Sequence, residues 1–170
     1  MNKSILFLIA AALLAAPAMS QKIAYVESQS ILEAMPEYQK ANQEIEQKAA
    51  QWEEEVKAKF NEVETLYQNY MDSERMLSEE MRQQKQEEIF EAERKAQEFK
   101  EKKFGIEGEL FQLREEKIKP LQEKIYQAAE DIAKANGYDF IFDKGPDVPW
   151  IYTNPEHNLT DELMEDIGLE

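Results

Sequence analysis

The stretch between Pro36 and Pro120 contains no proline, and its only glycines are Gly105 and Gly108. It is rich in Glu, Gln, Lys and Ala, and a narrow apolar stripe runs through it at helical spacing. Proline and glycine are the residues that most disfavour a helix interior, so their scarcity favours long helices here. Short segments with β character lie on both sides. The chain is therefore expected to form long helical arms on a small base that contains strands.

Residues 1–20 have the features of a cleavable secretory signal peptide. Lys3 makes the start positive, residues 5–16 form an apolar run that is short for a bilayer span, and Ala18 and Ser20 are small residues at the cleavage site. We predict cleavage between Ser20 and Gln21. An N-terminal membrane anchor is the alternative.

Acidic residues dominate the charge. The chain has 36 Asp and Glu against 20 Lys and Arg, and its formal charge of −16 becomes −17 when Lys3 leaves with the signal peptide. Such a surface lacks the Lys and Arg clusters that bind nucleic acid, and it disfavours docking on anionic lipid. The sequence contains no Cys, so packing or assembly rather than disulfides must stabilise the fold.

No common catalytic or cofactor-binding pattern is present in the sequence. Gly105 and Gly108 lack the Gly-Lys-Ser/Thr of a phosphate loop, and His157 is the single histidine. Without Cys, a zinc site of the usual ligands is not expected. We predict no catalytic residues, no cofactor and no metal site, and therefore a protein that binds rather than an enzyme.

The first arm carries an apolar seam with steps of three and four. Its members are Ile45, Ala49, Trp52, Val56, Phe60, Val63, Tyr67 and Tyr70. This is the narrow stripe of a coiled coil rather than the wide stripe of a helix buried in a globule. The pattern falters after Met71, and Ser78 followed by two Glu residues indicates a new helix start. We predict a turn near residues 72–78.

A second seam follows the turn. Its members are Ile89, Ala92, Ala96, Phe99, Ile106, Leu110, Leu113, Leu121, Ile125, Ala128, Ile132 and Ala135. Gly105 and Gly108 are expected to weaken this helix, and Pro120 to kink or break it, because proline lacks the N–H of the helical ladder. Asn136-Gly137 predicts the end of the helix.

Three short strands are predicted, over about residues 22–27, 138–143 and 148–153. A lone short strand is unstable, so the chain must return to its start. A helical hairpin does this, and the Ser78 cap favours it over one continuous helix whose strands pair between chains. The predicted fold is α+β: a small β-sheet base with a long antiparallel coiled-coil hairpin.

The predicted base comprises residues 21–36 and 120–170, and the arm comprises residues 37–119. Such a base is too small to bury much apolar surface by itself. We therefore expect its aromatic and apolar residues to meet in a core shared between chains: Ile23, Tyr25, Tyr138, Phe140, Phe142, Trp150 and Tyr152. A monomeric base whose aromatics face the root of the hairpin is the alternative.

Short runs near both ends of the chain match a known family. They are residues 22–26 (KIAYV), 30–34 (SILEA), 36–38 (PEY), 119–121 (KPL), 136–144 (NGYDFIFDK) and 159–162 (LTDE). In order and spacing these runs resemble the Skp/OmpH family of periplasmic chaperones. The resemblance implies a jellyfish-like homotrimer in the periplasm, with helical arms that hang from a hub and hold unfolded outer-membrane β-barrel proteins without ATP.

Apolar residues off the seam, or beyond its tight part, are the candidate client-binding residues. They are Leu66, Met71, Met76, Leu77, Met81, Phe90, Phe104 and Phe111. Phe104 and Phe111 continue into Ile118 and Ile125 at seven-residue spacing, which would make a stripe facing a cavity. Met and aromatic side chains suit weak, adaptable contacts. The alternative is that these residues widen the packing face between the arms.

The turn region departs from the positive arm tips of the well-known family members. It mixes Arg75 and Arg82 with four acidic residues: Asp72, Glu74, Glu79 and Glu80. Direct docking of the tips on a membrane is therefore not expected. Two other classes of function stay open: a periplasmic coiled-coil spacer or adaptor, and an acidic ion- or ligand-binding stalk.

Overall fold

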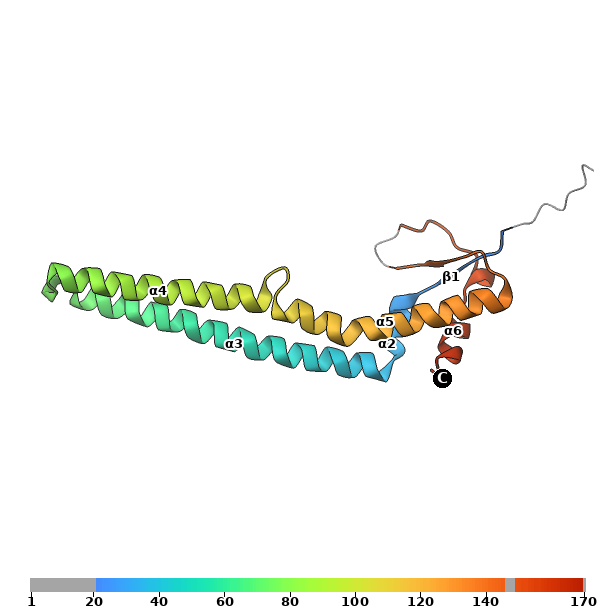
Figure 1. The fold of residues 1–170 in the computed structure, drawn as a ribbon, viewed down its shortest axis with the longest axis horizontal. Coiled ribbons are helices and arrows are strands. Elements are labelled where there is room, and N and C mark those ends of the chain that lie inside the picture. Colours follow the sequence, from blue (N-terminus) through green and yellow to red (C-terminus); the bar gives the residue numbers. More distant parts are fainter. Residues whose placement is uncertain (1–20, 146–148, 170) are drawn as a thin grey trace, which may run out of the picture.

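The computed structural model describes residues 21–145 and 149–169, so the predicted signal peptide lies outside the described residues. The elements are β1 (Ile23–Val26), α2 (Ser28–Ala34), α3 (Pro36–Ser73), the 3₁₀ turn η1 (Glu74–Met76), α4 (Glu79–Phe104), α5 (Glu109–Asn136), β2 (Phe140–Asp143), η2 (Pro155–His157) and α6 (Thr160–Asp166). In Figure 1, α3 runs away from the base and α4 and α5 return beside it. The predicted hairpin is confirmed, and the single continuous helix is wrong.

The turn between the arms lies where the sequence predicts it. α3 ends at Ser73, η1 follows, and the Ser78 hydroxyl caps α4 by accepting a hydrogen bond from the Met81 N–H at 3.3 Å. Glu79 and Glu80 lie in the first turn of α4, near the positive end of its dipole. With 38 residues, α3 is about 57 Å long at a rise of 1.5 Å per residue.

The return arm is interrupted at residues 105–108 rather than at Pro120. α4 ends at Phe104 and α5 begins at Glu109, and Pro120 lies inside α5. Of the kink or break predicted at Pro120, the break does not occur. α5 packs against α3 and against α2 and α6 of the base, and these contacts keep the helix continuous where proline lacks an N–H. Gly137 ends α5 with a φ of 70°, as predicted.

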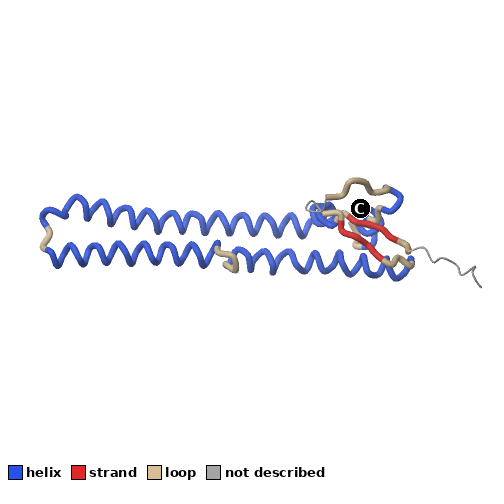
Figure 2. The backbone as a smooth tube through the Cα atoms, turned by 90° about the horizontal axis from the view of Figure 1, so that it is seen from above, coloured by secondary structure: helices blue, strands red, loops and turns tan. Residues whose placement is uncertain are grey.

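β1 and β2 form a parallel two-stranded sheet, in which Ile23 is opposite Phe140 and Val26 is opposite Asp143. Figure 2 shows the two strands side by side at the base end of the hairpin. The Ser28 hydroxyl donates a 2.6 Å hydrogen bond to Asp143 and so joins the start of α2 to the end of β2. Segments from opposite ends of the chain therefore meet in one sheet.

The predicted third strand is wrong over residues 149–153, which are not a strand, and Val148 lies outside the described residues. Pro149 has no N–H to donate to a ladder. The place beside β1 is instead taken by Asn158, which forms an isolated bridge with Tyr25, and the Leu159 N–H donates to the Tyr25 carbonyl at 2.9 Å.

The hydrophobic core of the base lies under one face of the sheet, where α2, α5 and α6 meet it. Its buried members are aliphatic residues and one methionine: Ala24, Val26, Ile31, Leu32, Met35, Ile125, Ala128, Ile132, Leu159 and Leu163. A single chain therefore has a core of its own in the base. None of its buried members is aromatic, so it differs from the aromatic core that the sequence predicted. Within the described residues no helix is long and apolar enough to cross a membrane.

Candidate functional site

The outer face of the base is apolar and exposed. Phe140 and Phe142 lie on the side of β2 away from the core, with ring centroids 6.2 Å apart, and Trp150 meets Phe142 edge-on at 6.0 Å. Together with Ile23, these residues keep 38% to 48% of their surface exposed. Clustered exposed apolar residues of this kind mark interaction surfaces. We call these four residues the base face.

The other three predicted base residues lie elsewhere. Tyr25 is buried, with the Lys144 Nζ 5.3 Å from its ring, and Tyr138 packs against the core with the Lys22 Nζ 4.0 Å from its ring. Tyr152 is 78% exposed. Tyr25 and Tyr138 are thus held within one chain, whereas Tyr152 is free to contact another molecule.

Two exposed apolar residues near the base face are missing from the sequence predictions. Ile151 is fully exposed and Tyr126 on α5 is 56% exposed. Ile151 lies between the predicted base residues Trp150 and Tyr152 but was not included among them. Tyr126 lies off the predicted seam of Ile125 and Ala128, so the criterion applied to the arms would have found it, but it was not applied to the base. Tyr126 lines a groove between α5 and β2 with Ala129, Phe140 and Ile141.

β2 also has an unpaired edge. Within the described residues its only strand partner is β1, so backbone N–H and C=O groups on its other side are open to another strand. Such edges are templates for pairing between chains unless they are covered.

Five of the eight candidate residues on the arms are exposed. Their exposed fractions run from 47% to 82%, for Met71, Met76, Met81, Phe90 and Phe111. Leu66, Leu77 and Phe104 are half-buried. Phe104 packs edge-on against Trp52, with ring centroids 6.5 Å apart, and so contributes to the contact between the arms.

The predicted seven-residue stripe is not one surface. Ile125 is 1% exposed and belongs to the core of the base, whereas Phe111 is 49% exposed. The loop at residues 105–108 also separates Phe104 from Phe111. The prediction of a continuous stripe is wrong because heptad spacing holds only along an uninterrupted helix.

The seam between the arms is only partly closed. Ile45, Trp52, Tyr70 and Ala96 are buried, but Phe60 is 36% exposed and Tyr67 46% exposed. The hollow between α3 and α4 near Leu66 is lined largely by charged side chains: Lys59, Glu62, Glu88, Glu91 and Lys95. One hairpin therefore leaves apolar surface uncovered along its length.

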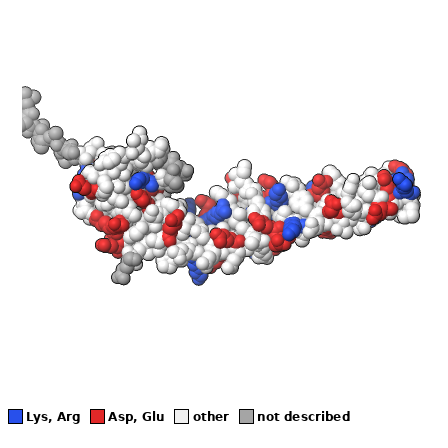
Figure 3. Space-filling view, turned by 180° about the vertical axis from the view of Figure 1, so that it is seen from behind, with Lys and Arg blue, Asp and Glu red and all other residues white. Residues whose placement is uncertain are grey.

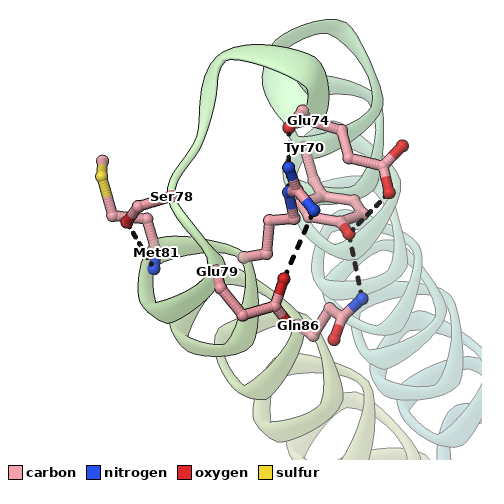
Figure 4. A network of polar contacts seen from close by, with 7 residues as sticks. Tyr70, Glu74, Ser78, Glu79, Met81 and Gln86 are labelled. Carbon is pink, nitrogen blue, oxygen red and sulfur yellow. Dashed lines mark hydrogen bonds and ion pairs between the residues drawn. The ribbon is translucent and has the colours of Figure 1, made fainter.

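A polar network holds the two arms together at the tip (Figure 4). The Tyr70 hydroxyl donates to Glu74 at 3.0 Å and accepts a hydrogen bond from the Gln86 side chain of α4 at 2.9 Å. The Arg82 guanidinium donates to the Glu74 carbonyl at 3.2 Å and pairs with Glu79 at 3.3 Å. Burial, and next the hydrogen bond to Glu74, raise the pKa of Tyr70 above its ordinary value. The phenol therefore stays neutral and bridges the arms.

Replacing Tyr70 by Phe is expected to loosen the tip without unfolding the arm. The ring keeps its packing, but one hydrogen bond between the arms is lost, which corresponds to about fivefold faster local opening. Hydrogen exchange of the amides around residues 70–86 measures this. Tyr67→Phe is the matched control, because Tyr67 is 46% exposed. Equal exchange in both variants would contradict the bridging role of Tyr70.

Charge is spread over the arms rather than gathered at one place. Figure 3 shows Asp and Glu along the visible face of the molecule, interspersed with Lys and Arg, and both kinds of charge at the tip. Within residues 21–145 and 149–169 there is no group of three His, Asp or Glu side chains that could hold a metal ion.

The fold defines a class of protein in which a long helical hairpin extends from a small α/β base with an apolar outer face. Comparison with protein families identifies the group more closely. The family model "Outer membrane protein (OmpH-like)" matches residues 22–167, so the chain belongs to the OmpH-like family. This confirms the resemblance found in the sequence.

One solved structure with a similar fold comes from Caulobacter crescentus CB15 and is provisionally assigned as an OmpH-like outer membrane chaperone. The TM-score is 0.67 at 10% sequence identity, and the match covers 89% of this chain and 86% of that chain. At this identity the likeness establishes the fold alone. Among curated protein sequences, none matches this chain.

Proposed function

We propose that this protein is a periplasmic holdase chaperone that binds unfolded outer-membrane proteins without ATP and prevents their aggregation. Membership of the OmpH-like family supports a chaperone role, as does the fold shared with the C. crescentus protein. The observation that carries the proposal is the row of exposed Met and Phe side chains along a hairpin that does not cover them. Such side chains bury apolar area without demanding one geometry.

The base face is the proposed assembly surface. Three copies would bury the base face of each chain against the others. The unpaired edge of β2 would then be able to form backbone hydrogen bonds with a neighbouring chain. The three arms would then surround a cavity in which a client is held, following the trimer expected from the family resemblance. Tyr152 and Ile151 lie on the exposed segment after β2 and are positioned to widen this interface.

Charge repulsion is proposed to keep the arms apart. Each mature chain would have a formal charge of −17 after loss of Lys3, and like charges on neighbouring arms repel over about 8 Å at physiological salt. Client contacts would therefore depend on Met71, Met76, Phe90 and their exposed neighbours rather than on charge attraction. The signal peptide predicted at residues 1–20 would deliver the chain to the periplasm.

Dilution of a urea-unfolded outer-membrane β-barrel protein into buffer tests this function. A molar excess of the assembled protein is expected to suppress light scattering from the aggregating client. A variant with serine at Met71, Met76, Met81 and Phe90 is expected to suppress it less, because four exposed apolar contacts are removed. Serine at four exposed polar positions of α4 is the matched control: Gln84, Glu87, Gln97 and Lys100. A spacer or adaptor would leave scattering unchanged at any excess, and that result would sink the chaperone proposal.

A further inference from the structure

The return arm, made of α4 and α5, is longer than the part of α3 that it pairs with by about one helical turn, and the loop at residues 105–108 accommodates the difference. From the contact of Tyr70 with Gln86 to that of Trp52 with Phe104, both arms advance by 18 residues. From there to the ion pair of Glu44 with Lys117, α3 advances by 8 residues and the return arm by 13. The return arm thus contains four to five residues that have no counterpart on α3.

The loop has a defined structure. The Gly105 N–H donates to the Glu101 carbonyl at 2.8 Å, and the Gly108 N–H donates to the Gly105 carbonyl at 2.9 Å. Lys103 and Glu109 form an ion pair across the loop. Residues six apart lie on different faces of an uninterrupted helix, so this ion pair exists only while the loop is present.

The two glycines are required by space rather than by backbone angles. A Cβ atom at Gly105 would lie 2.5 Å from the Glu101 carbonyl oxygen. A Cβ atom at Gly108 would lie 2.9 Å from both the Gly105 nitrogen and the Lys103 carbonyl oxygen. Any larger residue would push the loop apart, and glycine also disfavours the competing helix.

The sequence pattern supports a second arrangement. Phe99, Ile106, Leu110 and Leu113 belong to the second seam, and Lys103 fills the heptad position between the first two, which gives steps of four, three, four and three with one charged member. In a continuous helix Ile106 would therefore lie on the seam. In the loop it is 92% exposed.

We propose that residues 105–108 store one turn of helix, and that winding them into a continuous α4–α5 helix shifts the return arm by one turn against α3. Four residues at 1.5 Å each correspond to a slide of about 6 Å. The loop state is held by the two glycines and the Lys103–Glu109 ion pair. The wound state is favoured by placing Ile106 in the seam. Because either α4 or α5 must change partners on α3, the arm has two discrete arrangements that differ in reach.

Spin labels in the return arm measure which arrangement is present. The chain has no Cys, so labels at Gln97→Cys and Glu115→Cys are unique. These residues lie five helical turns apart on one face, which gives about 27 Å between them in a continuous helix and about 21 Å when four residues are looped out. Double electron–electron resonance is expected to find the shorter distance in the otherwise unmodified protein.

Gly108→Ala is expected to move the distance distribution to the longer value, because its Cβ atom clashes in the loop and fits the helix. Glu109→Gln, which removes the loop-specific ion pair without adding backbone strain, is expected to populate the longer distance in part. Glu107→Gln is the matched control and is expected to leave the distribution unchanged. If both Gly108→Ala and Glu109→Gln keep the shorter distance, or if Gly108→Ala broadens the distribution without a peak at the longer one, the stored turn is ruled out. The distance does not depend on client binding, so this result and the light-scattering result are independent.

Discussion

Replacing Phe140 and Phe142 by serine is expected to yield a folded monomer. Both side chains are exposed in the single chain, at 48% and 43%, and neither belongs to its core. If the base face joins three copies, each Phe contributes about 2 kcal/mol of burial, so losing two per chain corresponds to at least a hundredfold weaker association. Sedimentation velocity measures the change in mass, and far-UV circular dichroism reports whether the helices remain.

Phe90→Ser with Phe111→Ser is the matched control for this prediction. These residues are 59% and 49% exposed but lie on the arm, away from the base face. The control is expected to sediment like the unmodified protein. An unmodified protein that sediments as a monomer, or an oligomer that survives the substitutions at Phe140 and Phe142, would show that the base face is not the assembly surface.

Replacing Ile31 by alanine is expected to destabilise the base strongly. Ile31 is fully buried beneath the sheet, where it packs with residues of α5 and α6. Removing its three outer carbons leaves a cavity, which lowers the free energy of unfolding by about 2–5 kcal/mol. Urea unfolding followed by circular dichroism, at one fixed protein concentration because assembly adds to stability, measures the loss.

Ile106→Ala is the matched control, since it makes the same chemical change at a residue that is 92% exposed. Its free energy of unfolding is expected to stay within about 0.5 kcal/mol of the unmodified value. Similar losses at Ile31 and Ile106 would mean that the aliphatic cluster does not carry the stability of the base.

Local signals in the sequence predicted the ends of the helices well. Ser78 caps α4, and Gly137 ends α5 in the left-handed conformation. Each of these features depends on residue types within a few positions, so the same chemistry acts in the isolated segment and in the fold. The position of the hairpin tip followed from them.

Features that depend on distant partners were predicted less well. Pro120 stays helical because α5 is packed against other elements on both sides of it, and Asn158 rather than residues 149–153 lies beside β1. Sequence spacing does not show which segment of the chain will pair with a given edge of the sheet. Tyr25 is buried and Tyr138 is partly buried within one chain, next to Lys144 and Lys22, and these neighbours come from distant parts of the sequence.

The candidate binding surface was predicted in its residue types but not in its extent. The exposed Met residues near the tip, Phe90 and Phe111 fit the prediction that apolar residues off the seam stay uncovered. Phe104 and Ile125 share the same heptad pattern, yet one packs on Trp52 and the other lies in the core. Hydrophobicity alone cannot separate an apolar residue that stays exposed from one that packs against a partner in the same chain.

The sequence by itself determined that the chain forms two long arms and where they turn, because helix propensity, caps and heptad spacing are local. The family was indicated separately, by short runs near both ends of the chain that resemble its known members. Only the tertiary structure decided that the return arm loops out a turn at Gly105–Gly108 instead of breaking at Pro120. It also decided that the core of the base is aliphatic and leaves Phe140, Phe142 and Trp150 exposed. The physical reason is that register and burial depend on which surfaces meet across more than a hundred residues, and packing between those surfaces outweighs local preference.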